Sequence, residues 1–282
     1  MIHQEGHFKS TDATNLYYQS WMQSRDSKPD HDGIIAIVHG SGEHSGRYAN
    51  VVNHFSELGY KLYAFDFRGH GKSAGRPGHV QAWQEYRDDL DCYLHLIEEE
   101  NPGKPVFLYG HSMGGQIVLD YLTSGKHRAV AAVVCSAPAI NPPPTSPLLI
   151  FVGKILTFIW PTISLNNGLD VNDISRDAAV IKAYVEDPLV SAKITARFAA
   201  EFLACIDRVQ ANADKIDVPL FLFHGSADRI IPMQGTESFY SKVVFADKKL
   251  EIYQGGFHEP HNDLQQQEVF RDIEKWLDSR LI

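Results

Sequence analysis

Short runs of consecutive apolar residues alternate with longer segments of helical spacing along most of the chain. Uninterrupted apolar runs are typical of strands buried on both faces of a parallel sheet. Such runs lie at Gly33–Val38, Leu62–Phe65, Val106–Tyr109, Val130–Val134, Leu220–Phe223 and Leu250–Tyr253. Segments of helical spacing follow them at Tyr48–Leu58, Trp83–Glu99, Met113–Leu122, Thr236–Val244 and Val269–Leu277. The alternation predicts an α/β fold with a mostly parallel, doubly wound sheet.

The N-terminal segment departs from this alternation. Gly6–Lys9 and Leu16–Trp21 flank a turn-forming stretch, Asp12-Ala13-Thr14-Asn15. This pattern is typical of an antiparallel hairpin. We therefore expect a hairpin at one edge of the sheet.

A long insertion separates the fourth and fifth predicted buried strands. It begins with Asn141-Pro142-Pro143-Pro144, and its part from 178 to 213 has helical spacing without another clear strand. About 80 residues are too many for an ordinary connection. We predict a core of residues 1–138 and 218–282 and an inserted helical cap, or lid, of residues 139–217.

One stretch of the cap, Pro147–Leu165, is apolar enough to be weighed as a membrane span. Lys154 lies near its middle, where a charge would cost about 3 kcal/mol, and Pro161 interrupts it. Both features argue against a span.

Composition excludes several classes of function. With 26 basic and 35 acidic side chains, the net charge of −9 offers no general attraction to nucleic acid. The three cysteines, Cys92, Cys135 and Cys205, form no C-x-x-C pair, so neither a disulfide framework nor a thiolate zinc site is indicated. The first residues show no secretory signal pattern, which makes a cytoplasmic location the default expectation.

Polar residues gather directly after the predicted strands, where open parallel sheets bind their ligands. Gly110-His111-Ser112-Met113-Gly114 fits the G-x-S-x-G motif and stands between an apolar run and a helical segment. In that context the motif places a serine hydroxyl on a tight turn above the sheet. We therefore predict Ser112 as a nucleophile.

A serine hydroxyl needs a histidine to take its proton and an acid to orient that histidine. In this fold class the chain order is serine, acid, histidine, and Asp228 and His258 satisfy it after the last two strands. His39, His111 and His224 also follow strands, but they adjoin motif glycines and are interpreted as packing or supporting groups. Asp217 and Asp247 compete with Asp228, but both precede a strand and belong at the opposite edge of the sheet.

Negative charge on the acyl oxygen requires preorganised backbone donors. Met113, directly after the nucleophile, supplies one N–H group. Ser41, which follows Gly40 after the first buried strand, is the candidate for the other.

These segments resemble the monoacylglycerol lipase and lysophospholipase branch of the α/β-hydrolases. The matches are His39-Gly40-Ser41-Gly42-Glu43-His44-Ser45-Gly46-Arg47-Tyr48, Asp66 to Ser73, Gly110 to Gly115, Glu186 to Leu189, His224 to Asp228, and His258-Glu259. The resemblance runs nearly end to end and weakens in the first half of the cap.

The resemblance implies the α/β-hydrolase fold and a serine esterase without cofactor or metal that acts on single-chain acylglycerols. It implies that Glu43, Arg47 and Tyr184 line the pocket for the glycerol part, although loop-stabilising contacts explain these residues equally well. It also implies that Phe151, Ile155, Phe158 and Ile159 form an acyl tunnel or a lid that touches the membrane transiently, with plain packing in the cap as the alternative for half of them. The expected location is therefore cytoplasmic with peripheral contact at a membrane.

Other functions stay open on sequence grounds. A lysophospholipase or a medium-chain carboxylesterase would use the same three residues, and so would an aminopeptidase of the wider group. A ligand-binding member of the fold without turnover is a further alternative, since a fold does not dictate a function. Such a protein would usually lack one of the three residues, and this chain keeps all of them.

Overall fold

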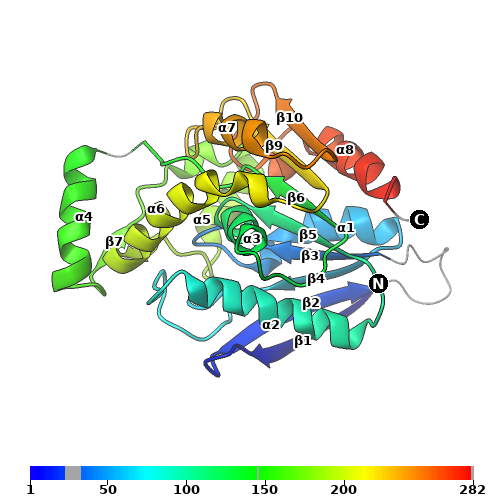
Figure 1. Cartoon of the computed structure of the whole chain (residues 1–282), viewed down its shortest axis with the longest axis horizontal. Coiled ribbons are helices and arrows are strands. Elements are labelled where there is room, and N and C mark those ends of the chain that lie inside the picture. Colours follow the sequence, from blue (N-terminus) through cyan, green and yellow to red (C-terminus); the bar gives the residue numbers. More distant parts are fainter. Residues whose placement is uncertain (23–32, 145, 281–282) are drawn as a thin grey trace.

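The computed structural model describes residues 1–22, 33–144 and 146–280. Its centre is an eight-stranded sheet in the order β1-β2-β4-β3-β5-β6-β9-β10 (Figure 1). The strands are β1 (Ile2–Lys9), β2 (Asn15–Met22), β3 (Ile34–Val38), β4 (Lys61–Phe65), β5 (Val106–His111), β6 (Ala132–Ser136), β9 (Leu220–Gly225) and β10 (Lys248–Tyr253). From β4 to β10 all neighbours are parallel, whereas β2 pairs antiparallel with β1 and β4. The predicted sheet and its edge hairpin are confirmed.

Helices cover both faces of the sheet. Ile34, Ala36 and Val38 of β3 pack in one core with residues of α2 (Gln84–Glu100), α3 (Met113–Thr123), α6 (Ala196–Ala211) and α7 (Gln234–Lys242). Ile35 and Ile37 point the other way, into a core shared with α1 (Ala49–Glu57) and α8 (Gln266–Asp278). Since neither face meets water, the central strands are apolar throughout rather than alternating.

The last strand differs from the prediction in its burial. Leu250–Tyr253 was expected to be buried on both faces, but most of β10 is only partly buried. The reason is its place at the edge of the sheet, where it pairs with β9 alone.

The segment between β6 and β9 also contains strands, which contradicts the expectation of an all-helical stretch from 178 to 213. It consists of α4 (Pro147–Ile159), β7 (Ser164–Asn166), α5 (Ala178–Glu186), β8 (Lys193–Thr195) and α6. β7 and β8 pair antiparallel. Helix α5 ends because Asp187 precedes Pro188 and takes an extended conformation, as residues before proline usually do. Helix α6 starts afresh where the Thr195 hydroxyl accepts the Phe198 N–H group.

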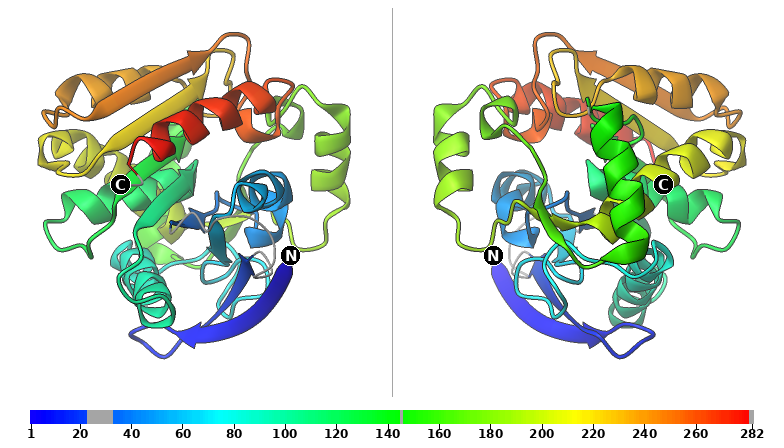
Figure 2. Two further views of the ribbon diagram at one scale, coloured as in Figure 1. Left: turned by 90° about the vertical axis from the view of Figure 1, so that its right-hand side faces the viewer. Right: turned by 90° about the vertical axis from the view of Figure 1, so that its left-hand side faces the viewer.

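Helix α4 lies on the outside of the molecule and packs against α6 (Figures 1 and 2). The Thr157 hydroxyl joins them by donating to the Ala196 carbonyl at 3.0 Å. Helix α4 has 13 residues. Within the described ranges, no helix combines the length and apolar character needed to cross a membrane.

Candidate active site

The predicted nucleophile lies on a strained turn between β5 and α3. Ser112 has a φ of 50°, a conformation that L-residues with a side chain rarely adopt. The turn is tight because α3 approaches β3 closely: a Cβ atom on Gly114 would lie 2.1 Å from the Val38 carbonyl oxygen. Glycine is therefore required at position 114. The turn places the Ser112 side chain at the carboxyl end of the sheet.

Three side chains from separate loops form a hydrogen-bonded chain at this edge. Ser112 Oγ lies 2.9 Å from His258 Nε2, and His258 Nδ1 lies 2.7 Å from Asp228 Oδ2. Since a carboxylate can only accept, Nδ1 carries the proton and Nε2 is free to accept the serine proton. The structure thus brings together the three residues proposed from the sequence.

The carboxylate of Asp228 is held by four donors. Oδ1 accepts the N–H groups of Ile230 and Ile231 at 2.8 and 2.9 Å. Oδ2 accepts from His258 and from His224 Nε2, the latter at 2.9 Å. Burial raises the pKa of Asp228, but its attraction to His258 and these hydrogen bonds outweigh burial and hold the pKa well below the usual range. Asp228 therefore stays ionised.

The two competing acids lie elsewhere. Asp247 pairs with Arg280, and its carbonyl accepts the N–H group of Leu220 where β9 begins. Asp217 pairs with His127 at 3.1 Å. Both belong to the opposite edge of the sheet from His258, as the sequence predicted.

The environment of His258 predicts how activity depends on pH. Burial lowers the pKa of this histidine, but the charge and hydrogen bond of Asp228, with smaller effects of Glu259 and Glu43, leave it above the ordinary value of 6.5. Only neutral His258 can accept the serine proton, so activity should fall as the pH drops through this raised pKa. We expect the acid limb of kcat/KM, measured with an uncharged p-nitrophenyl ester, to have its midpoint above 6.5. A midpoint below that value would contradict this picture.

The two predicted oxyanion donors lie beside the nucleophile. Met113 begins α3, and N–H groups in the first turn of a helix have no partner within it. Ser41 follows Gly40, whose N–H group donates to Glu43 Oε1 at 2.6 Å. A Cβ atom on Gly40 would lie 3.3 Å from the Cβ atom of Ser112, so this loop runs next to the nucleophile. The role of both donors remains a prediction.

Of the three residues predicted to line the pocket for the glycerol part, Arg47 contacts both Glu43 and Tyr184. Arg47 Nη1 donates to Glu43 Oε2 at 2.6 Å, and the guanidinium carbon lies 4.5 Å from the centre of the Tyr184 ring. Arg47 also pairs with Glu259. The sequence predicted no role for Glu259, which appeared only as the residue after His258 in a matching segment. An acidic residue directly after the predicted base was the signal that could have found it.

The predicted apolar cap residues are mostly exposed. On α4, the exposed fractions are 42% for Ile155, 86% for Phe158 and 77% for Ile159. The backbone of Phe151 lies in the same helix, but its side chain is outside the described part. Exposure to this degree favours a surface contact over the wall of a closed tunnel.

The three histidines interpreted as supporting groups are buried around the site. His39 Nδ1 donates to the Gly40 carbonyl at 2.7 Å, and its Nε2 accepts the Phe67 N–H group at 3.0 Å. His111 lies against His258, with ring centres 5.0 Å apart. His224 donates a hydrogen bond directly to the catalytic acid candidate, Asp228, a contact that the sequence did not indicate.

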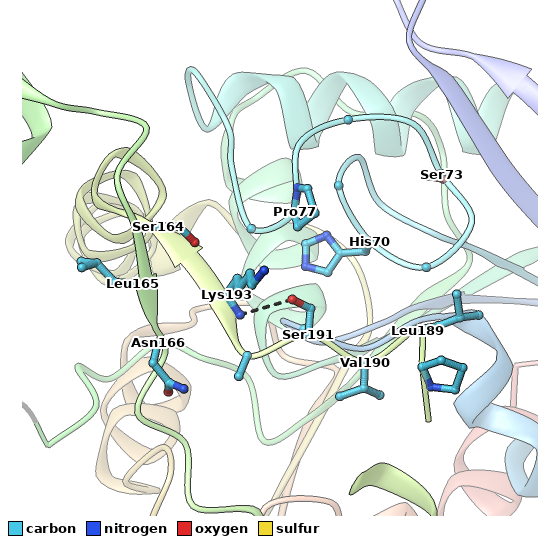
Figure 3. A pocket seen from close by; sticks show the side chains of 17 residues that line it. His70, Ser73, Pro77, Ser164, Leu165, Asn166, Leu189, Val190, Ser191 and Lys193 are labelled. Carbon is cyan, nitrogen blue, oxygen red and sulfur yellow. Dashed lines mark hydrogen bonds between the residues drawn. The ribbon is translucent and has the colours of Figure 1, made fainter. Parts of the chain in front are cut away.

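A hollow of about 700 Å³ adjoins the loop of residues 40–43, which carries Ser41 and is called the oxyanion loop below (Figure 3). It lies between the loop of residues 69–78 and the segments 164–166 and 188–193, and Gly42 contributes to its wall. The Ser191 N–H group donates to the Gly42 carbonyl at 2.8 Å. Neither Ser112 nor His258 lines this hollow, so the reacting atoms lie outside it.

Comparison with known proteins agrees with this geometry. The family model described as "Serine aminopeptidase, S33" matches residues 29–265. A monoacylglycerol lipase of Mycolicibacterium smegmatis is 33% identical over 281 residues, which are 98% of this chain and 98% of that protein. The chain belongs to the serine aminopeptidase S33 family of α/β-hydrolases.

Solved structures of this α/β-hydrolase group match over nearly the whole chain. The monoacylglycerol lipase of Paleococcus ferrophilus has a TM-score of 0.82 at 32% identity, covering 99% of this chain and 100% of that one. A soluble variant of the Saccharomyces cerevisiae monoglyceride lipase, in complex with a substrate analogue, has a TM-score of 0.89 at 26% identity, covering 99% and 96%. The chain is a serine hydrolase of the esterase and lipase type.

Proposed function

We propose that the enzyme hydrolyses monoacylglycerol to fatty acid and glycerol through an acyl-Ser112 intermediate. The observation that carries the proposal is the hydrogen-bonded chain from Ser112 through His258 to Asp228. The substrate class is supported by similar proteins over nearly full length that are named monoacylglycerol or monoglyceride lipases.

The reaction would proceed in two halves. Ser112 Oγ attacks the acyl carbonyl carbon while His258 Nε2 takes the serine proton, and the N–H groups of Ser41 and Met113 stabilise the charged oxygen. The tetrahedral species collapses as His258 passes the proton to the departing glycerol oxygen. A water molecule, deprotonated by His258, then attacks the acyl-serine, and the fatty acid leaves as Ser112 regains its proton.

Three other activities on esters or amides would use the same three residues and the same chemistry. A Bacillus subtilis relative 26% identical to this chain is named Phospholipase YtpA. Lysophospholipids are therefore one alternative substrate class. The family description names aminopeptidases. A medium-chain carboxylesterase is the third alternative, because nothing in the described cap defines chain length.

The decisive test compares substrates that share one acyl chain. Purified enzyme would be given monodecanoylglycerol, decanoyl lysophosphatidylcholine and p-nitrophenyl decanoate, together with an amino acid p-nitroanilide. Of the two lipids, we expect monodecanoylglycerol to have the higher kcat/KM. In a series of p-nitrophenyl esters, we expect medium or long acyl chains to be preferred. Preference for the lysophospholipid, or turnover of the anilide alone, would overturn the proposed substrate.

We also propose that α4 contacts the lipid surface that holds the substrate. Ile155, Phe158 and Ile159 are spaced three and four positions apart, so they share one side of the helix. Trp160, 58% exposed, extends this apolar face at the end of the helix. A monoacylglycerol substrate resides in such a surface, and an apolar helix face can bury itself at the boundary between head groups and acyl chains.

Replacing Phe158 and Ile159 together by aspartate should weaken binding to phosphatidylcholine vesicles at least about tenfold, because burying each apolar side chain contributes about 1.5–3 kcal/mol. Co-sedimentation with vesicles measures the binding. Val244, 73% exposed and outside α4, provides the control: V244D should bind like the unchanged protein. Hydrolysis of p-nitrophenyl butyrate in solution should be unaffected in both variants. Equal binding of the double variant would refute contact through α4.

A further inference from the structure

Arg47 lies at the centre of a buried ionic cluster beside the active site. Its Nη1 donates to Glu43 Oε2 at 2.6 Å and to Glu259 Oε1 at 2.8 Å, and its Nη2 donates to Glu259 Oε2 at 2.9 Å. The side chains of Arg47, Glu43 and Glu259 are only 8%, 3% and 4% exposed. A buried cluster of two carboxylates and one guanidinium is costly unless its partners are well placed, so its location needs a reason.

The two carboxylates belong to the two loops that must act together. Glu43 holds the oxyanion loop, because its Oε1 accepts the Gly40 N–H group one residue before Ser41. Glu259 directly follows His258, and its Oε2 accepts from Asn262 Nδ2 within the same loop. These glutamates are 216 positions apart in the chain, from 43 to 259, and Arg47 joins them directly.

All four carboxylate oxygens of the cluster are occupied. Besides Gly40, Glu43 Oε1 accepts from the Tyr48 hydroxyl at 2.7 Å. Besides Arg47, Glu259 Oε2 accepts from Asn262 Nδ2 at 2.8 Å. Each oxygen therefore has a protein donor, which suits a fixed support better than a pair of acceptors awaiting the hydroxyl groups of a substrate.

The cluster also contacts the inserted segment. Tyr184 of α5 lies against the Arg47 guanidinium, and the Glu259 N–H group donates to the Ile174 carbonyl at 2.8 Å. The position of the insertion and the position of the two loops are thus connected through the same residues.

We propose that Glu43, Arg47 and Glu259 form a positioning clamp that sets the oxyanion donors and His258 at a working distance from each other. The clamp rests on the serine esterase function proposed above and deepens it. Its residues act through Ser41 and His258. Misplacing a reacting group by about 1 Å can cost about 10²-fold in rate, so such a clamp matters for catalysis.

The test uses two esters of one acid, monodecanoylglycerol and p-nitrophenyl decanoate, with the variants R47K and E259Q. A lysine is a point charge and cannot bridge both carboxylates, and a glutamine keeps the shape of Glu259 but loses its charged fork with Arg47. We expect each variant to lose at least about tenfold in kcat/KM by the same factor on both esters. Labelling of Ser112 by a fluorophosphonate should slow in parallel.

Two outcomes would overturn the clamp. A loss confined to monodecanoylglycerol would show that these side chains bind the glycerol part, and an unchanged kcat/KM on both esters would show that they do neither. The double variant R47K/E259Q should lose no more than R47K alone, because Glu259 acts through Arg47; additive losses would also contradict the proposal.

A matched control separates positioning from loss of stability. Arg208 pairs with the buried Asp120 at 2.7 Å, away from both loops. R208K should lower the melting temperature and leave kcat/KM within about twofold. If R47K does not fold, E259Q decides alone, since it keeps the side-chain shape. Failure of the proposed function would appear separately, as activity that survives in S112A.

Discussion

Replacing Ser112 by alanine should lower kcat/KM for monodecanoylglycerol by about 10⁵–10⁶-fold. The variant loses the oxygen atom that forms the acyl intermediate, while the turn, the oxyanion donors and the binding surfaces remain. The melting temperature should be maintained or rise slightly, since alanine removes a hydroxyl and leaves the tight turn intact. Release of fatty acid, followed at high enzyme concentration, is the measurement.

The matched control for this change is Ser241→Ala. Ser241 is exposed on α7, and its hydroxyl donates to the Ser238 carbonyl, so it has no contact with the reacting groups. We expect its kcat/KM to stay within about twofold of the unchanged enzyme. Undiminished release of fatty acid by the Ser112 variant would remove the proposed mechanism.

Asp228→Asn should have the second largest effect, a loss of about 10⁴-fold in kcat. An amide in place of the carboxylate can donate to His258 Nδ1, which leaves the proton on Nε2, where it blocks transfer from Ser112. The cationic form of His258, which the carboxylate stabilises during the reaction, also loses its partner. KM should change much less than kcat, because Asp228 is buried behind the histidine.

Asp247 supplies the control for this prediction. It is an acid of the same part of the chain that pairs with Arg280 at the other edge of the sheet. Asp247→Asn should leave kcat within about twofold. The account would be wrong if Asp247→Asn were inactive and Asp228→Asn were not.

The sheet and the catalytic candidates could be predicted because their signals are local. Buried parallel strands are apolar throughout, and Gly110 and Gly114 are required by close backbone contacts that leave a motif in the sequence. Chain order then selected Asp228 and His258, since the carboxyl ends of parallel strands meet at one edge. The structure brings both side chains within hydrogen-bonding distance of their partners.

The rest depended on contacts between distant segments. The break at Asp187-Pro188 was visible as a proline, but the pairing of β7 with β8 across the insertion was not. A binding role for Glu43 and Arg47 came only from the family resemblance, and loop-stabilising contacts explained them equally well. Only the fold shows that Arg47 also pairs with Glu259, and that His224 adds a hydrogen bond to Asp228.

The most direct test of the central claim is labelling with a fluorophosphonate, followed by mass mapping of the peptides. A serine activated by His258 and Asp228 should take up one phosphonyl group per chain, on the peptide that carries Ser112, as hydrolysis of monodecanoylglycerol is lost in proportion. Full activity without an adduct, or an adduct on a different residue, would contradict the account.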